Sequence, residues 1–118
     1  MELCFDERGF ASVVRVNMEE LGADSAERVR ASLLKGIEGR CWVVCDLSAV
    51  RFMDSSGLGV LVSLLKALRT RGEVRFIGVG AQLRQLLSLT GLDRVFAVDP
   101  DEATALSALE SSRARQVA

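Results

Sequence analysis

The stretch CWVVCDL, residues 41–47, constrains the fold of this chain more than any other stretch, because it is almost wholly apolar. A run of this kind suits a central strand of a parallel sheet that is covered on at least one face. Parallel neighbours of such a strand need crossover connections, which are usually helices. We therefore expect an α/β fold built around Cys41–Leu47.

The segments before this strand predict a hairpin followed by a helix. ELCFDERGFASVVRV predicts two short strands, Glu2–Asp6 and Phe10–Val16, joined by a tight turn with a left-handed glycine. DSAERVRASLLKGIEG predicts an amphipathic helix. Asp24 and Glu27 have capping-box spacing at its start, and Gly39 ends it.

The segments after the strand alternate between helix and strand. In chain order we expect a helix over Gly57–Thr70, a strand over Glu73–Val79, a helix ended by Gly91, a short strand RVFAV, and a helix capped by Asp99. This order predicts a mixed, mostly parallel sheet of four to five strands with the first strand as an antiparallel edge. A length of 118 residues predicts one domain, residues 1–118, and the polar tail from about residue 112 is expected to fray.

Charge and hydropathy narrow the classes of partner. Fifteen Lys and Arg residues stand against sixteen Asp and Glu residues, a balance that does not favour nucleic acid as a partner. Lys66 and Arg69 interrupt the most apolar segment, so we expect no membrane insertion. Met1–Gly9 is charged rather than signal-like, which indicates a cytoplasmic protein.

The cysteine and histidine content limits the available chemistry. The cysteines are Cys4, Cys41 and Cys45, and the last two have the spacing of one strand face, so we interpret them as reduced core thiols. A redox or metal pair is the alternative, although no CxxC is present. Histidine is absent, which excludes Ser-His-Asp and Cys-His mechanisms and histidine zinc sites. We expect no cofactor and no metal.

The segment RFMDSSGLGVLVSLL, Arg51–Leu65, carries an acid, two serines and two glycines at the start of a helix and allows three interpretations. Ser56 could simply cap the helix, with the glycines permitting close packing on the sheet. The glycines could instead form a phosphate cradle, although GLG lacks the further residues of a dinucleotide fingerprint or a P-loop. In the third interpretation Ser56 caps the helix and Ser55 is left exposed for a kinase. Phosphorylation there would add about −1.5 to −2 charges beside Asp54.

At these residues the sequence resembles the anti-sigma-factor antagonist family, whose domain, the STAS domain, is shared with sulfate transporters. The matching segments are VVCDLSAVRFMDSSGLGVLVSLLKALRTRG and VRFIGVGAQLRQLLSLTGLDRVFAV, followed by an acidic start to a last helix. The resemblance implies a STAS-type βα superhelix with helices mainly on one face of the sheet. It also implies that Ser55 is the phosphoacceptor and that neighbouring residues shape a partner-binding surface: Asp54, Ser56, Gly57, Leu58 and Gly59.

Partner switching is the function that the resemblance implies. The unphosphorylated antagonist would bind an anti-sigma factor that is a serine kinase and so release a sigma factor. The kinase would phosphorylate the antagonist and a PP2C-type phosphatase would reverse this, so the protein is a substrate and not an enzyme. Two alternatives stay open: a STAS scaffold subunit of a lipid-transport or chemosensory assembly, and a small enzyme that binds a phosphorylated substrate.

One loop departs from the family pattern. Family members often carry Gly-Glu-Leu-Asp before the first helix, where this chain has MEELGAD. Glu20 and Leu21 match, Glu19 replaces the glycine, and Gly22 stands at the aspartate position unless Asp24 has taken its place. Because the family uses this loop to contact the kinase, we expect Asp24 to bind the partner.

Overall fold

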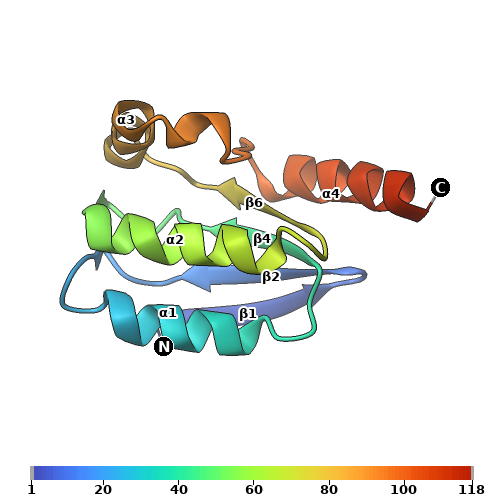
Figure 1. Cartoon of the computed structure of the whole chain (residues 1–118), viewed down its shortest axis with the longest axis horizontal. Helices are drawn as coiled ribbons and strands as arrows, with labels where there is room; N and C mark the ends of the chain where they lie inside the picture. Colours follow the sequence, from blue (N-terminus) through green and yellow to red (C-terminus); the bar gives the residue numbers. More distant parts are fainter. Residues whose placement is uncertain (1, 118) are drawn as a thin grey trace.

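A computed structural model describes residues 2–117 of the chain, which fold around a four-stranded sheet (Figure 1). Its strands lie in the order β1 (Leu3–Arg8), β2 (Ala11–Val16), β4 (Trp42–Asp46) and β6 (Glu73–Ile77). The pair β1–β2 is antiparallel, and the pairs β2–β4 and β4–β6 are parallel. The predicted mixed, mostly parallel sheet is therefore confirmed, and Gly9 occupies the hairpin turn with φ +65°.

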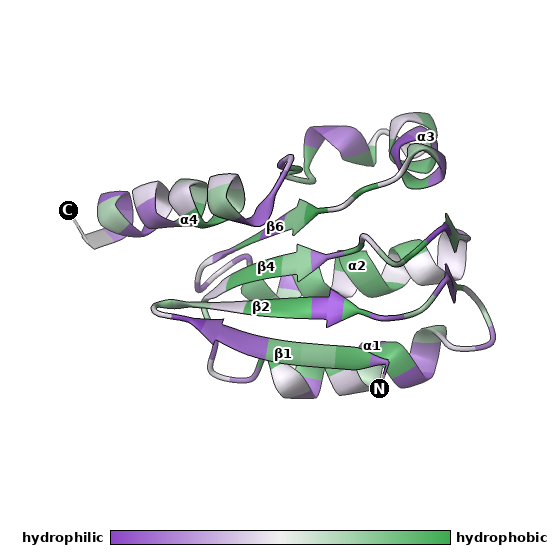
Figure 2. Cartoon of the chain, turned by 180° about the vertical axis from the view of Figure 1, so that it is seen from behind, coloured by the Kyte–Doolittle hydropathy of each residue, from purple (hydrophilic) through white to green (hydrophobic). Residues whose placement is uncertain are grey.

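Three helices pack on one face of this sheet: α1 (Ala26–Gly36), α2 (Ser55–Leu68) and α3 (Ala81–Thr90). The fourth helix, α4 (Glu102–Val117), packs against the other face of the sheet, beside β6. Figure 2 shows the molecule from behind, with the strands of the sheet in front of α1 and α2. The predicted placement of helices mainly on one face is confirmed.

The side chains of β4 alternate between two buried cores, which explains the apolar sequence of this strand. Val43 and Cys45 belong to the core beneath α1, α2 and α3, whereas Trp42 and Val44 belong to the second core, which contains Leu109 of α4. A strand that is buried on both faces has no position for a solvated side chain. Asp46, at the end of β4, is buried as well, and its carboxylate pairs with Arg15.

A two-stranded parallel sheet that the sequence did not predict lies at the carboxyl end of the main sheet. It joins β3 (Glu20–Leu21) to β5 (Phe52–Met53), with Glu20 opposite Phe52. The backbone N–H groups of Arg51 and Phe52 both donate to the carbonyl of Glu19, at 2.7 and 3.1 Å. This pairing brings the MEELGAD loop beside the start of α2.

The caps of α1 and α4 differ from the predicted ones. Ser25 is the N-cap of α1 and its side chain makes no capping hydrogen bond, so the predicted Asp24–Glu27 capping box is wrong. Instead, Glu27 pairs with Arg30 on the helix surface. Asp101 rather than Asp99 accepts from the first turn of α4, at 2.8 Å from the Thr104 nitrogen.

Two further segments near the C-terminus depart from expectation. Asp99 pairs with Arg75 of β6, which fixes the segment before α4 against the sheet. The RVFAV segment forms no strand: a short 3₁₀ helix, η1 (Leu92–Arg94), is followed only by an isolated bridge between Phe76 and Val98. Helix α4 extends to Val117, and the fraying expected from about residue 112 stays a prediction.

The cysteines are free thiols in different surroundings. Cys45 is fully buried, and burial, with a contribution from Asp46, raises its thiol pKa to about 12. Cys41 precedes β4, is half-buried, and packs with the second core, so the prediction that both thiols share one face is wrong. Within residues 2–117 no helix combines the length and apolarity needed to cross a membrane.

Candidate functional site

The start of α2 forms the centre of the candidate site, and Asp54 is its N-cap. Asp54 is extended, with φ −101° and ψ −172°, and its Oδ1 accepts from the Gly57 nitrogen at 3.0 Å. The helix begins at Ser55, so the prediction that Ser56 caps it is wrong. An aspartate immediately before the helix reaches the third amide of the first turn, which a serine already inside the helix cannot do.

The second oxygen of Asp54 ties the MEELGAD loop to the helix. Oδ2 accepts from the Ala23 nitrogen at 3.2 Å, and a Cβ at Gly22 would lie only 2.8 Å from the same oxygen. The hydrogen bond from Gly57, opposed by partial burial and reinforced by Ala23, lowers the pKa of Asp54 below its usual value. The carboxylate is therefore ionised near neutral pH, at the positive end of the helix dipole.

Ser55 and Ser56 are the first two residues of α2, and both are exposed. Neither hydroxyl makes a hydrogen bond to any other part of residues 2–117, because Asp54 already supplies the cap. Because Asp54 rather than Ser56 supplies the cap, both serine hydroxyls are left over, that of Ser56 as well as that of Ser55.

The other predicted residues of the motif differ in exposure. Gly57 allows the helix to approach the small sheet, since a Cβ there would lie 2.1 Å from the Leu21 carbonyl oxygen. Leu58 is only 5% exposed and packs in the core, so its side chain is not on the surface where a partner would dock. Gly59 is exposed, with open space beside it.

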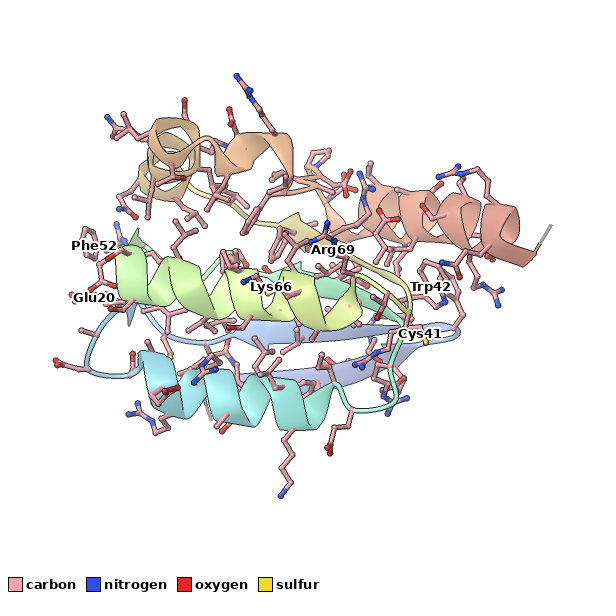
Figure 3. All side chains as sticks on the ribbon, viewed as in Figure 1. Glu20, Cys41, Trp42, Phe52, Lys66 and Arg69 are labelled. Carbon is pink, nitrogen blue, oxygen red and sulfur yellow. The ribbon has the colours of Figure 1, made fainter. Side chains whose placement is uncertain are left out.

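A shallow hollow of about 360 Å³ lies beside Asp54 and brings the loop residues to the site. Asp24 and Glu20 line it together with the exposed ring of Phe52, which is 48% accessible. Glu20 and Phe52 project at the same end of the molecule, at the start of α2 (Figure 3). Asp24 thus lines the same hollow as Asp54, its role in partner binding stays a prediction, and Phe52 adds an apolar group that the sequence did not indicate.

Gln82 is a positioning residue that sequence reasoning missed. Its side-chain carbonyl accepts from the Met53 nitrogen at 2.9 Å, and its amide donates to the Met53 oxygen at 2.8 Å. The side chain thereby satisfies the edge of β5 that β3 does not pair with, and it links α3 to the segment before Asp54. No spacing rule singles out a glutamine in the first turn of a helix.

The Asp-Leu-Ser end of β4 has a structural role. Asp46 Oδ1 accepts from the Ser48 nitrogen at 2.9 Å and its hydroxyl at 2.6 Å, and Oδ2 accepts from Arg15 at 3.1 Å. Burial disfavours the charge of Asp46, but the hydrogen bonds from Ser48 and Arg15 outweigh it, so its pKa is lowered. Within residues 2–117, no group of three or more His, Cys, Asp or Glu side chains could hold a metal ion.

The sheet order, the helix arrangement and the motif at the start of α2 agree with one family. The model of the STAS domain family matches residues 6–105. The chain belongs to this STAS domain family. Over 94 residues this STAS domain is 33% identical to the anti-sigma F factor antagonist of Paenibacillus polymyxa, an alignment that covers 77% of this chain and 80% of that protein.

Solved structures of anti-sigma factor antagonists share this fold. An anti-sigma factor antagonist from Mycobacterium paratuberculosis matches with a TM-score of 0.82 and 28% identity over 92% of each chain. The unphosphorylated antagonist SpoIIAA has the same fold, with a TM-score of 0.74 and 18% identity over 92% of this chain and 96% of that one. Phosphorylated SpoIIAA, from Bacillus, matches with a TM-score of 0.66 and 20% identity over 89% and 96%. The homologues of this STAS domain are thus anti-sigma factor antagonists, a family of regulators that are not catalysts.

Proposed function

We propose that this STAS domain is a partner-switching anti-sigma-factor antagonist whose switch is Ser55. The observation that carries the proposal is the exposed Ser55 hydroxyl, unbonded within residues 2–117 and next to the ionised cap Asp54. A relative named as an anti-sigma F factor antagonist, 33% identical, indicates an anti-sigma factor as the partner. The site would act in the cytoplasm, where sigma factors act.

The proposed modification is an ordinary phosphoryl transfer. The Ser55 oxygen attacks the γ-phosphorus of ATP bound to the anti-sigma kinase, the bond to the β-phosphate oxygen breaks, and ADP leaves. A base of the kinase takes the hydroxyl proton. A PP2C-type phosphatase reverses the step by hydrolysis, in which water replaces the serine oxygen and inorganic phosphate leaves.

The consequence for binding follows from charge and position. Asp54 already accepts the Gly57 and Ala23 hydrogen bonds, so a phosphoryl group on Ser55 points outward rather than replacing the cap. About −1.5 to −2 charges then lie beside Asp54 on the surface that carries Phe52 and Asp24. A kinase that approaches this surface through an apolar contact and close fit is repelled, and the antagonist dissociates.

The test combines modification with binding. Incubation with the cognate anti-sigma kinase and ATP should place one phosphoryl group on Ser55, located by peptide mass spectrometry. Ser55→Ala should accept none, and Ser55→Asp should bind the kinase at least tenfold more weakly, about 1.4 kcal/mol. Ser56→Ala, at the exposed neighbouring position, is the matched control for the site of modification and should still accept one phosphoryl group on Ser55. Phosphate on Ser56 alone, or full binding by Ser55→Asp, contradicts the switch and favours a scaffold role.

A further inference from the structure

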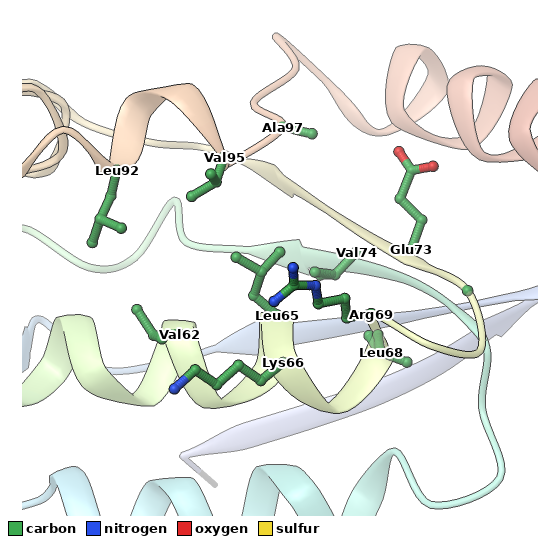
Figure 4. A pocket seen from close by; sticks show the side chains of 11 residues that line it. Val62, Leu65, Lys66, Leu68, Arg69, Glu73, Val74, Leu92, Val95 and Ala97 are labelled. Atoms are coloured by element: carbon green, nitrogen blue, oxygen red, sulfur yellow. The ribbon is translucent and has the colours of Figure 1, made fainter.

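An apolar groove of about 540 Å³ lies between the C-terminal half of α2 and the segment around η1 (Figure 4). Val62 and Leu65 form the wall on α2, and Leu92 and Val95 project toward them from the opposite side. Lys66 lies about 16 Å along the α2 axis from Ser55, at about 1.5 Å per residue. The groove is therefore separate from the candidate switch.

The rim of the groove on α2 is positively charged. Lys66 and Arg69 are exposed, and neither side chain makes an ion pair or a hydrogen bond to the rest of residues 2–117. Glu73, the acidic residue that lines the groove, pairs with Arg75 at 2.5 Å rather than with Lys66 or Arg69, and Arg75 also pairs with Asp99. The groove thus combines an apolar floor with two uncompensated cations along one edge.

The geometry fits an elongated occupant better than a small molecule. Val95 is 55% exposed, so the groove is open along one side, whereas small-molecule sites enclose most of their ligand. Val62 and Lys66 of α2, with Arg69 at its C-cap, are spaced i, i+4, i+7, which spans about 10 Å. Apolar anchors at i, i+3 or i+4, and i+7 of a partner helix span the same length.

We infer that this groove is a second docking site, which binds an amphipathic helix of a protein partner that carries carboxylates beside its apolar stripe. The apolar side chains of that helix cover Leu65, Leu92 and Val95. Its carboxylates pair with Lys66 and Arg69. Binding there does not depend on the state of Ser55, so the antagonist can hold one partner while it exchanges another.

The probe is a fluorescein-labelled, end-capped peptide of about 18 residues, long enough to form helix on binding. It carries leucine at i, i+4 and i+7 with glutamate at the flanking positions, and a matched peptide carries lysine in place of glutamate. The acidic peptide should bind in the range of tens of micromolar, measured by fluorescence anisotropy. Amide shifts in ¹H–¹⁵N spectra should be confined to residues 62–74 and 92–97, which contain the groove lining.

Variants of exposed residues test the charge and the apolar contact without disturbing the core. The double variant Lys66→Glu with Arg69→Glu should weaken binding of the acidic peptide at least tenfold and prefer the basic peptide. Val95→Asp should weaken binding of the acidic peptide at least fivefold. Lys35→Glu and Leu89→Asp, exposed residues outside the groove lining, should change affinity less than twofold. Ser55→Asp should bind the acidic peptide like the wild type, which separates this site from the switch.

Three results overturn the inference. One is no binding of the acidic peptide at millimolar concentration, and another is equal affinity for the two peptides. The third is sodium decanoate producing the same amide shifts and displacing the peptide, because the groove would then be a site for a small amphiphile.

Discussion

At the scale of single residues, Asp54 and Ser55 have different roles at the start of α2. Asp54 accepts one hydrogen bond from the helix and another from the loop, so it joins two segments that are far apart in the sequence. Ser55 contributes no such contact and is exposed. Substitution of Asp54 should therefore lower folding stability, whereas substitution of Ser55 should change recognition by the partner.

Asp54→Ala should lower the melting temperature by about 3–6 °C, because the helix loses its cap and the Ala23 amide loses its acceptor. Thermal unfolding followed by circular dichroism measures the shift, and hydrogen exchange at Ala23 and Gly57 should accelerate. Asp24→Ala is the matched control: the residue is exposed in the same loop, and its change should leave the melting temperature within about 1 °C. Equal melting temperatures for the two variants would contradict the role of Asp54.

The sequence could indicate this site but not the role of each residue in it. Asp, Ser and a second Ser are all favoured N-caps, so local propensity could not choose among Asp54, Ser55 and Ser56. The choice is made by β3–β5 pairing, which places Asp54 in an extended conformation next to Gly22. That contact joins residues that are distant in the sequence, and no spacing pattern predicts it.

At the scale of elements, the long periodic segments were predictable and the short ones were not. The apolar run of β4 and the leucine stripes of α2 and α3 carry enough pattern to predict type and order. RVFAV has the composition of a strand, yet it makes a single bridge, between Phe76 and Val98. The neighbouring residue Asp99 is held by Arg75, and the strand pairing does not extend further. Tertiary contacts override propensity over such short stretches.

The end of β4 should respond to pH through Asp46. Its pKa is lower in the folded protein than in the unfolded one, so its stabilising effect is present above the unfolded value, about 3.9, and is lost as pH falls through the folded value. Asp46→Asn should therefore be less stable than wild type at pH 7, and the difference should shrink at about pH 3. Urea titrations at the two pH values measure this.

The exposed Asp93, which makes no ion pair within the described residues, provides the control. Asp93→Asn should change stability little at either pH. An Asp46→Asn penalty of the same size at both pH values would show that shape, rather than charge, explains its effect.

At the scale of the whole molecule, the sheet separates two cores. The core beneath α1, α2 and α3 supports the candidate switch and the groove, whereas α4 closes a smaller core on the opposite face. Changes in the smaller core should consequently affect stability without reshaping the surface around Ser55.

Leu109→Ala tests this separation, because Leu109 is fully buried beneath α4. The lost contacts and the resulting cavity should lower the free energy of unfolding by about 2–4 kcal/mol, measured by urea titration. Kinase-dependent phosphorylation of Ser55 should proceed at the wild-type rate under conditions where the variant is folded. Leu106→Ala, at a partly buried position on the same helix, should lower the free energy of unfolding by less than Leu109→Ala does. A variant that is fully stable, or that alters phosphorylation of Ser55, would contradict the separation of the two cores.

The single tryptophan of the chain, Trp42, lies in this smaller core with Ala105 and Leu109 of α4. Indole emission depends on how dry the surroundings of the ring are, so detachment of α4 should shift the emission to the red. A partner bound at Ser55 or in the groove should leave the signal unchanged. The emission of Trp42 thus serves as an intrinsic reporter that distinguishes detachment of α4 from partner binding on the opposite side of the sheet.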